Sequence, residues 1–502
     1  MELKVKLLKW SAGVPVAMLN KETADKIGVH IKDRISIKTL SDKPKEIFTI
    51  VDTIKRVVKK NEIAISSEIK KMVGLRLGQK VDVNLAFAPK SMIFIKKKLM
   101  KKRLSQKELD EIIKDVVNNA LSESEISIFI SAMYEQGMSI KETVYLIKSI
   151  LKYGNQLKLR NKLVADKHSI GGIPGNRATP IVISICAAAG IIMPKSSSRA
   201  ITSSAGTADV IETVASVDFS IKELKKIIKK TGACIVWGGA LGLVPADSRI
   251  IRIEKLLKLD PEAMLLSSIM AKKLAMDADY IIIDIPYGKT AKVDKKKAIN
   301  LKRKFKKLGR IFRKNVEVFI MEAKEPMGTG VGPALELIDV IQILDPKLQG
   351  PRDLENKSLF LAGKLLEMTK KAKKGKGIIL AEKILFSGKA YQKFKQIIKA
   401  QNKNPKVKNI EKLLKSIKPA KFKKDILTQK SGKIEEIHNS KINSLARSTG
   451  CPVDKFSGLR IFVSAGDDVK RSDKLMTIYS ESRTRLKNAV KFYNTIKPIR
   501  IS

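Results

Sequence analysis

The chain has 502 residues, a length that predicts about three domains at roughly 150 residues per domain. It carries 100 Lys and Arg residues against 50 Asp and Glu residues, a formal net charge of +50, and 44% of its residues are hydrophobic. That apolar fraction suffices for sizeable cores and excludes a chain that is disordered throughout. The charge points to nucleic acids, anionic membranes or phosphorylated small molecules as partners, with lysines spread over solvated faces as the alternative.

The apolar runs, cysteines and histidines argue against a membrane, secreted or metal-binding protein. The longest apolar run, 178–194, is interrupted by Pro180 and Gly190, whereas a membrane helix needs about 18 uninterrupted apolar residues. The first residues place Glu2 and several lysines among apolar residues and so lack a signal-peptide core. The cysteines and histidines are scattered, without the paired spacing of disulfide frameworks or zinc sites. We therefore expect a cytoplasmic protein without a bound metal.

The first third of the chain predicts two different domains. Residues 1–86 contain short β-branched runs that are separated by glycines and lysine-rich turns, which indicates a β-rich domain or barrel. Residues 87–160 have helical periodicity and three capping boxes, in which a serine precedes a glutamate by three residues. These boxes start at Ser105, Ser122 and Ser139. We expect a helical domain here, to which residues 245–278 are added.

The rest of the chain predicts a large α/β domain and a small β-rich module, so the fold class is a multidomain α/β protein. Residues 161–430 alternate apolar runs with helical stretches, which is typical of a largely parallel or mixed sheet. The runs interpreted as buried strands are 163–166, 233–238, 280–286 and 316–321. The lysine-dense segment 369–430 is interpreted as solvated helices and connections around this core. Residues 431–502 have the turn and strand rhythm of a hammerhead or lipoyl-like domain.

A glycine-rich segment, D-K-H-S-I-G-G-I-P-G-N-R (166–177), follows the first apolar run of the α/β domain. Its glycines let backbone amides approach a ligand, while Lys167 and Ser169 supply a charge and a hydroxyl. Thr179 and Pro180 then predict the start of a helix, whose N-terminus favours anions. The segment is not a Walker A loop, and a simple tight turn is the alternative.

A second segment, K-S-S-S-R-A-I-T-S-S-A-G-T-A-D (195–209), surrounds Arg199 with hydroxyl groups. An arginine among hydroxyls can contact phosphate oxygens and ribose hydroxyls together. The alternative is a flexible polar linker, against which the apolar Ile201 and Ala205 and the helical pattern that follows both argue.

Two further segments complete the candidate site. In L-D-P-E-A-M-L-L-S-S-I-M-A-K-K (259–273), Ser268 and Lys272 share one helix face, which suits a ligand cleft or an ordinary surface. Asp260 precedes this helix and fits an N-cap, a position that stabilises a charged carboxylate. In D-I-P-Y-G-K-T-A-K (284–292), Lys289 and Lys292 follow a buried strand, at the end where ligands of parallel sheets bind.

These four segments, in this order, resemble the thymidine/pyrimidine-nucleoside phosphorylase family, and most closely its archaeal AMP phosphorylase branch. The family patterns are KHSxGG, a Ser-Arg loop that ends in Gly-Thr, and a helix of the form S-I-x-[AS]-K-K. The segment M-G-T-G-V-G-P-A-L-E (327–336) is also similar to the family's glycine-rich segment. The lysines after 284–287 and the β-rich extension before the helical domain favour the AMP branch over the pyrimidine enzymes.

The resemblance implies a pentosyltransferase that converts AMP and phosphate to adenine and ribose 1,5-bisphosphate, with CMP and UMP as further candidate substrates. It implies Asp260 as the proton donor, a role that conflicts with helix capping because donation needs the protonated acid. The implied phosphate contacts are Lys167, Ser169, Ser197 and Thr207. The implied nucleotide contacts are Gly172, Ser198, Arg199, Ala200, Ile201, Thr202, Ser203, Thr207, Ser268 and Lys292.

The resemblance also implies an active site between the helical and α/β domains, a homodimer or larger homo-oligomer, and no cofactor beyond the co-substrate phosphate. The nearest alternative is a thymidine or pyrimidine-nucleoside phosphorylase. A basic nucleic-acid-binding protein is a weaker alternative, since aromatic residues make up only 5% of the chain and no RNA- or DNA-binding motif is present. A phosphoribosyltransferase is disfavoured because no clustered acids for a diphosphate and Mg²⁺ site are found.

Overall fold

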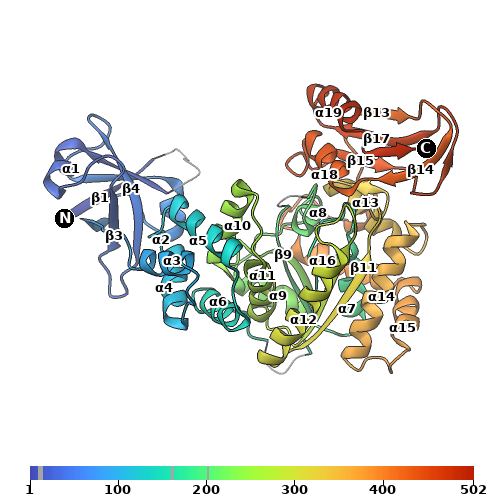
Figure 1. Ribbon diagram of the computed structural model, residues 1–502, viewed down its shortest axis with the longest axis horizontal. Helices are drawn as coiled ribbons and strands as arrows, with labels where there is room; N and C mark the ends of the chain where they lie inside the picture. The colour runs from blue at the N-terminus through green and yellow to red at the C-terminus, as the bar shows by residue number, and fades with distance from the viewer. Residues whose placement is uncertain (9–14, 160–162, 201–202) are drawn as a thin grey trace. The chain divides into compact units, whose positions relative to one another are not determined.

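The computed structural model describes residues 1–8, 15–159, 163–200 and 203–502. The chain is coloured from blue at its N-terminus to red at its C-terminus in Figure 1, and it divides into two compact units. One unit consists of Met1–Gly154 and Pro245–Ser267, and the other of Asn155–Val244 and Ser268–Ser502. In the described part of the chain, we find no helix long and apolar enough to cross a membrane.

The first unit begins with a closed six-stranded barrel in the order β1-β5-β2-β4-β3-β6. Its strands are β1 (Glu2–Leu7), β2 (Val16–Asn20), β3 (Arg34–Thr39), β4 (Glu46–Ile54), β5 (Glu62–Ile65) and β6 (Lys80–Leu85), and its helices are α1 (Lys21–Ile27) and α2 (Ser67–Val73). Alternate side chains such as Val81 and Val83 are buried inside, as expected where one face of a sheet is the core. The β-rich N-terminal domain predicted from the sequence is confirmed.

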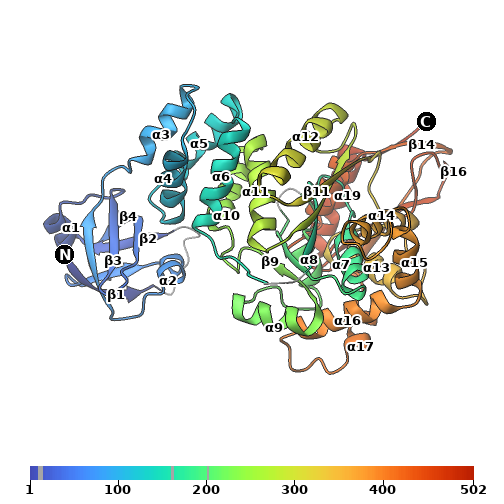
Figure 2. The same cartoon turned by 90° about the horizontal axis from the view of Figure 1, so that it is seen from below.

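A helical bundle follows the barrel in the same unit. Its helices are α3 (Ser91–Leu99), α4 (Gln106–Val117), α5 (Glu123–Gln136), α6 (Ile140–Lys152) and α10 (Pro245–Leu257), which lie side by side in Figures 1 and 2. The three predicted capping boxes are all present, with both hydrogen bonds at Ser105, Ser122 and Ser139. Arg249 of α10 donates to the carbonyls of Val116 and Leu121. The bundle is therefore discontinuous in sequence, because part of the α/β domain lies between α6 and α10 along the chain.

The α/β domain of the second unit contains five parallel strands. They are β7 (Ala165–Ser169), β8 (Met193–Ser197), β9 (Ala233–Trp237), β10 (Tyr280–Tyr287) and β11 (Asn315–Glu322). They form a sheet in the order β11-β10-β7 and a pair β8-β9, and a parallel bridge between Val164 and Ile192 lies beside β7 and β8. All described pairings among these strands are parallel, as the sequence predicted.

Helices from the same part of the chain accompany these strands. They are α7 (Ala178–Ala188), α8 (Thr207–Ile211), α9 (Ile221–Thr231), α11 (Glu262–Ala275), α12 (Lys295–Ile311), α13 (Pro333–Leu344), α14 (Arg352–Met368), α15 (Gly377–Phe386), α16 (Lys389–Gln401) and α17 (Ile410–Lys415). Most of the buried residues of one hydrophobic core come from α7, α13, α14, α15 and α16. In the lysine-dense segment, α16 buries Phe394, Ile397 and Ile398 in the core that contains α7. Exposed lysines such as Lys399 lie on its other face, so the helices of this segment are partly solvated and pack around the α/β core, whereas β13 (Phe422–Leu427) at its end does not belong to them.

The C-terminal strands form two small sheets beside α18 (Asn439–Ser448) and α19 (Arg483–Ile496), at the red end of Figure 1. The strands are β12 (Gly330–Val331), β13 (Phe422–Leu427), β14 (Gly432–Ile437), β15 (Gly458–Ile461), β16 (Asp468–Val469), β17 (Lys474–Ser480) and β18 (Ile499–Ile501). The sheet orders are β12-β15-β17-β13 and β16-β14-β18. Strand β13 lies before residue 431, where we expected the C-terminal domain to begin, yet it pairs with β17 of that domain. A partner about 50 residues farther along the chain leaves no local signal in the sequence.

Candidate functional site

The carboxyl ends of β7 and β10 hold a buried group of ion pairs. Lys167 lies on β7, and Asp284 lies on β10 as the register partner of Ser169. The Lys167 Nζ atom is 3.7 Å from Asp284 Oδ2 and 3.5 Å from Thr179 Oγ1. Lys357 of α14 places its Nζ atom 3.0 Å from the same oxygen of Asp284. Since ligands of open parallel sheets bind at this end of the strands, the group lies where an anion site is expected.

Burial and the neighbouring charges shift the pKa values of Lys167 and Asp284 in opposite directions. Burial lowers the pKa of Lys167 to about 8, although the neighbouring Asp284 carboxylate raises it. Burial raises the pKa of Asp284, but the charges of Lys357 and Lys167 outweigh burial and lower that pKa overall. The Asp284 side chain is therefore a carboxylate, and Lys167 loses its proton near pH 8.

A second buried group of ion pairs lies beside the first. The Lys273 Nζ atom donates to Asp166 Oδ2 at 2.5 Å, and the Lys195 Nζ atom is 3.4 Å from Asp166 Oδ1. Lys195 also donates to the carbonyl of Lys167 at 2.7 Å, which joins β8 to β7. Burial lowers the pKa of Lys273 well below its usual value, although the Asp166 carboxylate acts to raise it. The pKa of His168 is lowered well below its usual value by burial and by these lysines, so its imidazole is neutral.

Together these groups form what we call the buried lysine cluster. Its members are Lys167, Lys195, Lys273 and Lys357, with the carboxylates Asp166 and Asp284. Four lysines face two acidic side chains, so the cluster has two positive charges in excess when all six groups are ionised, and fewer once Lys167 or Lys273 loses its proton. In a region of low dielectric constant such an excess creates a positive potential that a bound anion would offset. The positive charge of the cluster therefore favours an anion at this edge of the sheet.

The predicted glycine-rich segment forms a turn that packs against the segment after β10. Gly171 and Gly172 have φ angles of +84° and +97°, which side-chain-bearing residues rarely adopt. A Cβ atom on Gly172 would lie 2.8 Å from the Cβ atom of Lys292. Lys292 is exposed, as is Lys289. The structure thus brings together Gly172 and Lys292, two of the predicted nucleotide contacts.

Arg177 joins the glycine-rich segment to the Ser-Arg segment. Its guanidinium forms an ion pair with Glu336 of α13, in which the Nη2 and Oε2 atoms are 2.6 Å apart. It also donates to Thr207 Oγ1 and to the carbonyl of Ala205, both at 2.8 Å. The sequence motif contained Arg177, but we did not predict a role for it. Arg177 fixes the orientation of the Thr207 hydroxyl, which is a predicted contact for phosphate and nucleotide.

We expected segment 195–209 to be a loop, and this prediction was wrong at both ends, because residues 195–197 belong to β8 and α8 begins at Thr207. Lys195, Ser196 and Ser197 belong to β8 and pair in parallel with β9. Their Lys and Ser side chains carry no strand signal, and pairing with β9 supplies the hydrogen bonds that a loop would lack. Ser197 ends the strand and Ser198 begins the loop, which places the predicted contacts at a strand end.

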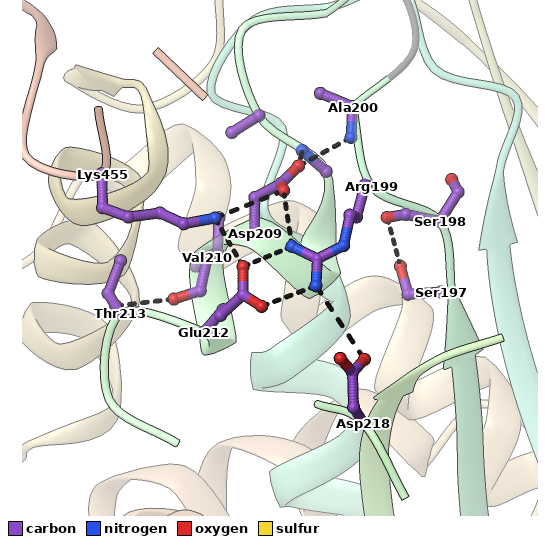
Figure 3. Close-up of polar contacts among 12 residues, drawn as sticks. Ser197, Ser198, Arg199, Ala200, Asp209, Val210, Glu212, Thr213, Asp218 and Lys455 are labelled. Atoms are coloured by element: carbon purple, nitrogen blue, oxygen red, sulfur yellow. Dashed lines mark hydrogen bonds and ion pairs between the residues drawn. The ribbon is translucent and has the colours of Figure 1, made fainter. Parts of the chain in front are cut away.

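Asp209 closes the Ser-Arg loop (Figure 3). Its Oδ2 atom accepts hydrogen bonds from the backbone nitrogens of Ala200 at 2.6 Å and Gly206 at 2.8 Å. A Cβ atom on Gly206 would lie 2.5 Å from the Ser198 carbonyl oxygen, so the two ends of the loop are in close contact. The predicted contacts Ile201 and Thr202 lie outside the described residues. Ser203 Oγ donates to the carbonyl of Ala205 at 3.1 Å.

The Arg199 side chain is held by acidic residues and a tryptophan. Both of its terminal nitrogens pair with Glu212, and the Nη2–Oε1 distance is 2.6 Å. Asp209 and Asp218 lie farther off, at 3.8 Å and 3.9 Å. The guanidinium carbon is 4.8 Å from the centre of the Trp237 ring, within range of a cation–π interaction. Its position is therefore set by contacts that the motif alone does not reveal.

The third predicted segment forms α11 and the residues before it. Lys272 Nζ donates to Ser268 Oγ at 2.7 Å, so the two predicted residues share a helix face and a hydrogen bond. Ser268 is buried, and Asp260 is half-buried in the segment before the helix. Helix α11 begins at Glu262, one residue later than the Pro261 expected from an Asp260 cap. The boundary between the two units falls within α11, and the role of Asp260 stays a prediction.

Metal and thiol chemistry has no evident site in the described part of the chain. Within residues 1–8, 15–159, 163–200 and 203–502, no group of three or more His, Cys, Asp or Glu side chains could hold a metal ion. The three cysteines are free and buried, and burial raises the pKa of Cys451 to about 12. These thiols are therefore protonated.

Three family models match successive parts of the chain. The helical bundle domain of a glycosyl transferase family matches residues 93–154, and the α/β domain of that family matches residues 161–391. The C-terminal domain of pyrimidine nucleoside phosphorylases matches residues 433–499. The order of these matches follows the bundle, the α/β domain and the C-terminal sheets.

Full-length relatives decide the family. The chain is 40% identical to the AMP phosphorylase of Pyrococcus furiosus over 99% of this chain and 97% of that protein. It is 39% identical to the AMP phosphorylase of Thermococcus kodakarensis and 37% identical to that of Methanococcoides burtonii, with at least 95% of each chain covered. The chain belongs to the AMP phosphorylase family. Membership of this family confirms the resemblance that the four segments indicated.

A solved structure supports the fold of the α/β part of this AMP phosphorylase family member. Anthranilate phosphoribosyltransferase from Thermus thermophilus matches with a TM-score of 0.51 at 16% identity, over 61% of this chain and 98% of that chain. At this identity the likeness concerns the fold alone. It confirms the predicted combination of helical and α/β domains.

Proposed function

We propose that this protein catalyses the phosphorolysis of AMP, which yields adenine and ribose 1,5-bisphosphate. The observation that carries the proposal is identity of 37–40% along nearly the whole chain to proteins named AMP phosphorylase. The reaction would make the protein a pentosyltransferase, in agreement with the glycosyl transferase match over residues 161–391. CMP and UMP are further candidate substrates.

The buried lysine cluster supports a site for inorganic phosphate. In our proposal Lys167, Ser169, Ser197 and Thr207 bind this phosphate, and the excess charge of the cluster stabilises it. Ser169 and Ser197 are half-buried at strand ends, and Thr207 is oriented by Arg177. Donors that are already oriented need no reorganisation when the nucleophile binds.

The proposed chemistry is a displacement at C1′ of the ribose. A phosphate oxygen forms a bond to C1′ while the bond from C1′ to the base nitrogen breaks, and the bonding electrons leave with the base. Asp260 supplies the proton that the departing adenine takes up, so the base leaves as a neutral molecule. The proposed nucleotide contacts orient AMP for this displacement; they are Gly172, Ser198, Arg199, Ala200, Ile201, Thr202, Ser203, Thr207, Ser268 and Lys292.

A pyrimidine-nucleoside phosphorylase is the second candidate function. The match of residues 433–499 to the C-terminal domain of those enzymes favours it. Such an enzyme would act on uridine or thymidine without a 5′-phosphate. Lys292 is exposed and lies next to Gly172. An ammonium group at this position suits a substrate that keeps its 5′-phosphate, which favours a nucleotide over a nucleoside as the substrate.

Identification of the products tests the proposal. The purified protein is incubated with AMP and phosphate, and ³¹P NMR follows the phosphorus signals. We expect loss of the AMP and inorganic phosphate signals and the appearance of two signals from one bisphosphate product. Release of ribose 5-phosphate instead would show hydrolysis and would overturn the proposal.

We further propose that the enzyme acts in the cytoplasm as a homodimer or larger homo-oligomer, with phosphate as co-substrate and no metal or organic cofactor. Light scattering on the purified protein measures its mass, and a monomer would contradict the assembly. Dialysis against a chelator should leave the rate of adenine release unchanged.

A further inference from the structure

We propose that the C-terminal domain positions the Ser-Arg loop of the nucleotide site, with Lys455 as the residue that sets the charge around Arg199. This inference rests on the proposed function. Lys455 lies within residues 433–499, far along the chain from the described loop residues 198–200 and 203–207. Figure 3 shows its ammonium group beside the carboxylates that hold Arg199.

The contacts of Lys455 are made with the two acids that organise the loop. The Lys455 Nζ atom is 2.6 Å from Glu212 Oε2 and 3.6 Å from Asp209 Oδ1. Glu212 Oε2 also accepts from Arg199, so a single carboxylate oxygen is shared by two cations. Asp209 holds the backbone of Ala200 through its other oxygen. Lys455 thus touches both the carboxylate that binds Arg199 and the one that closes the loop.

Two more side chains of the same domain reach the loop from helix α18. Asn443 accepts a hydrogen bond from the backbone nitrogen of Ser204 at 3.1 Å. Arg447 donates to the carbonyl of Ser203 at 3.4 Å. Asn443 and Arg447 are four residues apart and share one helix face. The C-terminal domain therefore contacts both the charged and the backbone parts of the loop.

Lys455 offsets part of the negative charge of the acidic side chains around Arg199. Asp209, Glu212 and Asp218 all lie near the Arg199 guanidinium, and Asp209 and Glu212 also contact Lys455. Burial raises the pKa of Glu212, but its hydrogen bonds with Arg199 and Lys455 outweigh burial and lower it, so the group is charged. Without Lys455 these acids would face Arg199 alone, and the local potential would turn more negative. An anionic nucleotide would then bind less well at the loop.

Lys455 is a positioning residue in this account, because it acts on the substrate through Glu212 and Arg199. Its loss should weaken the binding of AMP and leave the chemical step and the inorganic phosphate site largely unchanged. A residue that only stabilised the fold would instead lower activity toward both substrates together. The two roles are separated by the KM values for AMP and phosphate.

The test compares Lys455→Gln, Lys455→Arg and Glu212→Gln with the double variant Lys455→Gln/Glu212→Gln. For Lys455→Gln we expect KM for AMP to rise about five- to tenfold, with kcat and KM for phosphate within about twofold of the wild type. Lys455→Arg should restore KM for AMP. In the Glu212→Gln background the substitution at Lys455 should have little further effect, because the two residues act through one contact. Lys424→Gln, an exposed lysine on β13, is the matched control and should behave as the wild type.

The results separate this inference from the proposed function. If the wild type does not release adenine from AMP, the proposed function fails, and this inference fails with it. If the wild type is active but Lys455→Gln has an unchanged KM for AMP, only this inference is overturned. An equal rise in KM for AMP and KM for phosphate in Lys455→Gln, together with a lower Tm, would show a structural role and would also overturn this inference.

Discussion

The Nζ atom of Lys357 lies 3.0 Å from Oδ2 of Asp284, and both side chains are buried. Lys357 comes from α14, whereas Asp284 comes from the middle strand of the β11-β10-β7 sheet. Asp284 also lies 3.7 Å from Lys167, so a single carboxylate is shared by two lysines. This sharing leaves the buried lysine cluster short of negative charge, which is the electrostatic basis of the proposed phosphate site.

Removal of Lys357 should therefore affect both stability and phosphate binding. Lys357→Met leaves Asp284 with one cation fewer and should lower the free energy of unfolding by about 3 kcal/mol. It also removes one charge from the cluster, so KM for phosphate should rise about tenfold, equivalent to roughly 1.4 kcal/mol. Urea unfolding and steady-state kinetics measure the two effects.

A double variant controls for that prediction. Lys357→Met/Asp284→Asn removes the buried carboxylate together with its partner, so it should be less destabilised than the sum of the single variants. Additive losses in the urea experiment would show that the two side chains do not interact and would contradict the arrangement described here.

The lowered pKa of Lys167 leads us to expect that phosphate binding depends on pH. The pKa of Lys167 is lowered to about 8, and an ammonium group carries its charge only below its pKa. The charged fraction therefore falls as the pH rises through 8, and KM for phosphate should rise between about pH 7.5 and pH 9.5. Initial rates at varied phosphate concentration measure this profile.

Asp284 provides the control for the pH profile. Its carboxylate raises the pKa of Lys167, so Asp284→Asn should move the rise in KM for phosphate to lower pH. A profile that stays in place in this variant, or a KM that decreases with pH, is incompatible with a role for Lys167 in phosphate binding.

We expect the loss of the Asp260 carboxyl to lower kcat far more than it lowers the stability of the fold. Asp260→Asn should lower kcat by about 10²–10⁴-fold, the usual contribution of a general acid. If the residue only capped α11, its loss would cost about 1 kcal/mol of stability and little activity. Glu262→Gln removes an acid two residues farther along in the first turn of α11 and serves as the control. Comparable losses of kcat and Tm in Asp260→Asn would favour the capping role.

Gly171 and Gly172 offer a matched pair of substitutions. Both have positive φ angles, so an alanine at either position should cost about 1–3 kcal/mol of strain. A Cβ atom at Gly171 would meet nothing within 4 Å, whereas at Gly172 it would lie 2.8 Å from the Lys292 Cβ atom. Only Gly172→Ala should displace Lys292 and raise KM for AMP. An equal KM for AMP in both variants would exclude this contact from nucleotide binding.

Local signals in the sequence predicted much of the fold. The capping boxes at Ser105, Ser122 and Ser139 depend on residues three positions apart, and all three form. The apolar runs that became β9, β10 and β11 were also recognisable, because buried parallel strands consist of continuous apolar residues. Strand β8 was missed, since its Pro194, Lys195 and Ser196 acquire strand geometry only through pairing with β9.

Only those residues of the candidate site that lie in a distinctive local sequence could be predicted. Lys167 lies in a motif that stands out in the sequence, and Asp284 is a single acid in an otherwise apolar run, a signal that could have been used. Lys357 and Lys455 carry no such signal, because each is one lysine among many in a strongly basic chain. Only the packing of α14 and of the C-terminal domain brings them to the acids they contact.

The excess of lysines and arginines thus has two parts. A few of these residues are buried or held by acids at the proposed site, and many others lie on exposed faces of helices such as α12. In the proposed function the first group binds or surrounds phosphate groups, whereas the second accounts for much of the net charge of +50.

The most direct test of the proposed function is the kcat/KM for adenine release from AMP and from adenosine, measured side by side with and without phosphate. We predict phosphate-dependent release from AMP and a kcat/KM for adenosine at least about 100-fold lower, because adenosine lacks the 5′-phosphate that we propose Lys292 contacts. Release from adenosine or thymidine but not from AMP would contradict the proposed function, as would release that does not need phosphate.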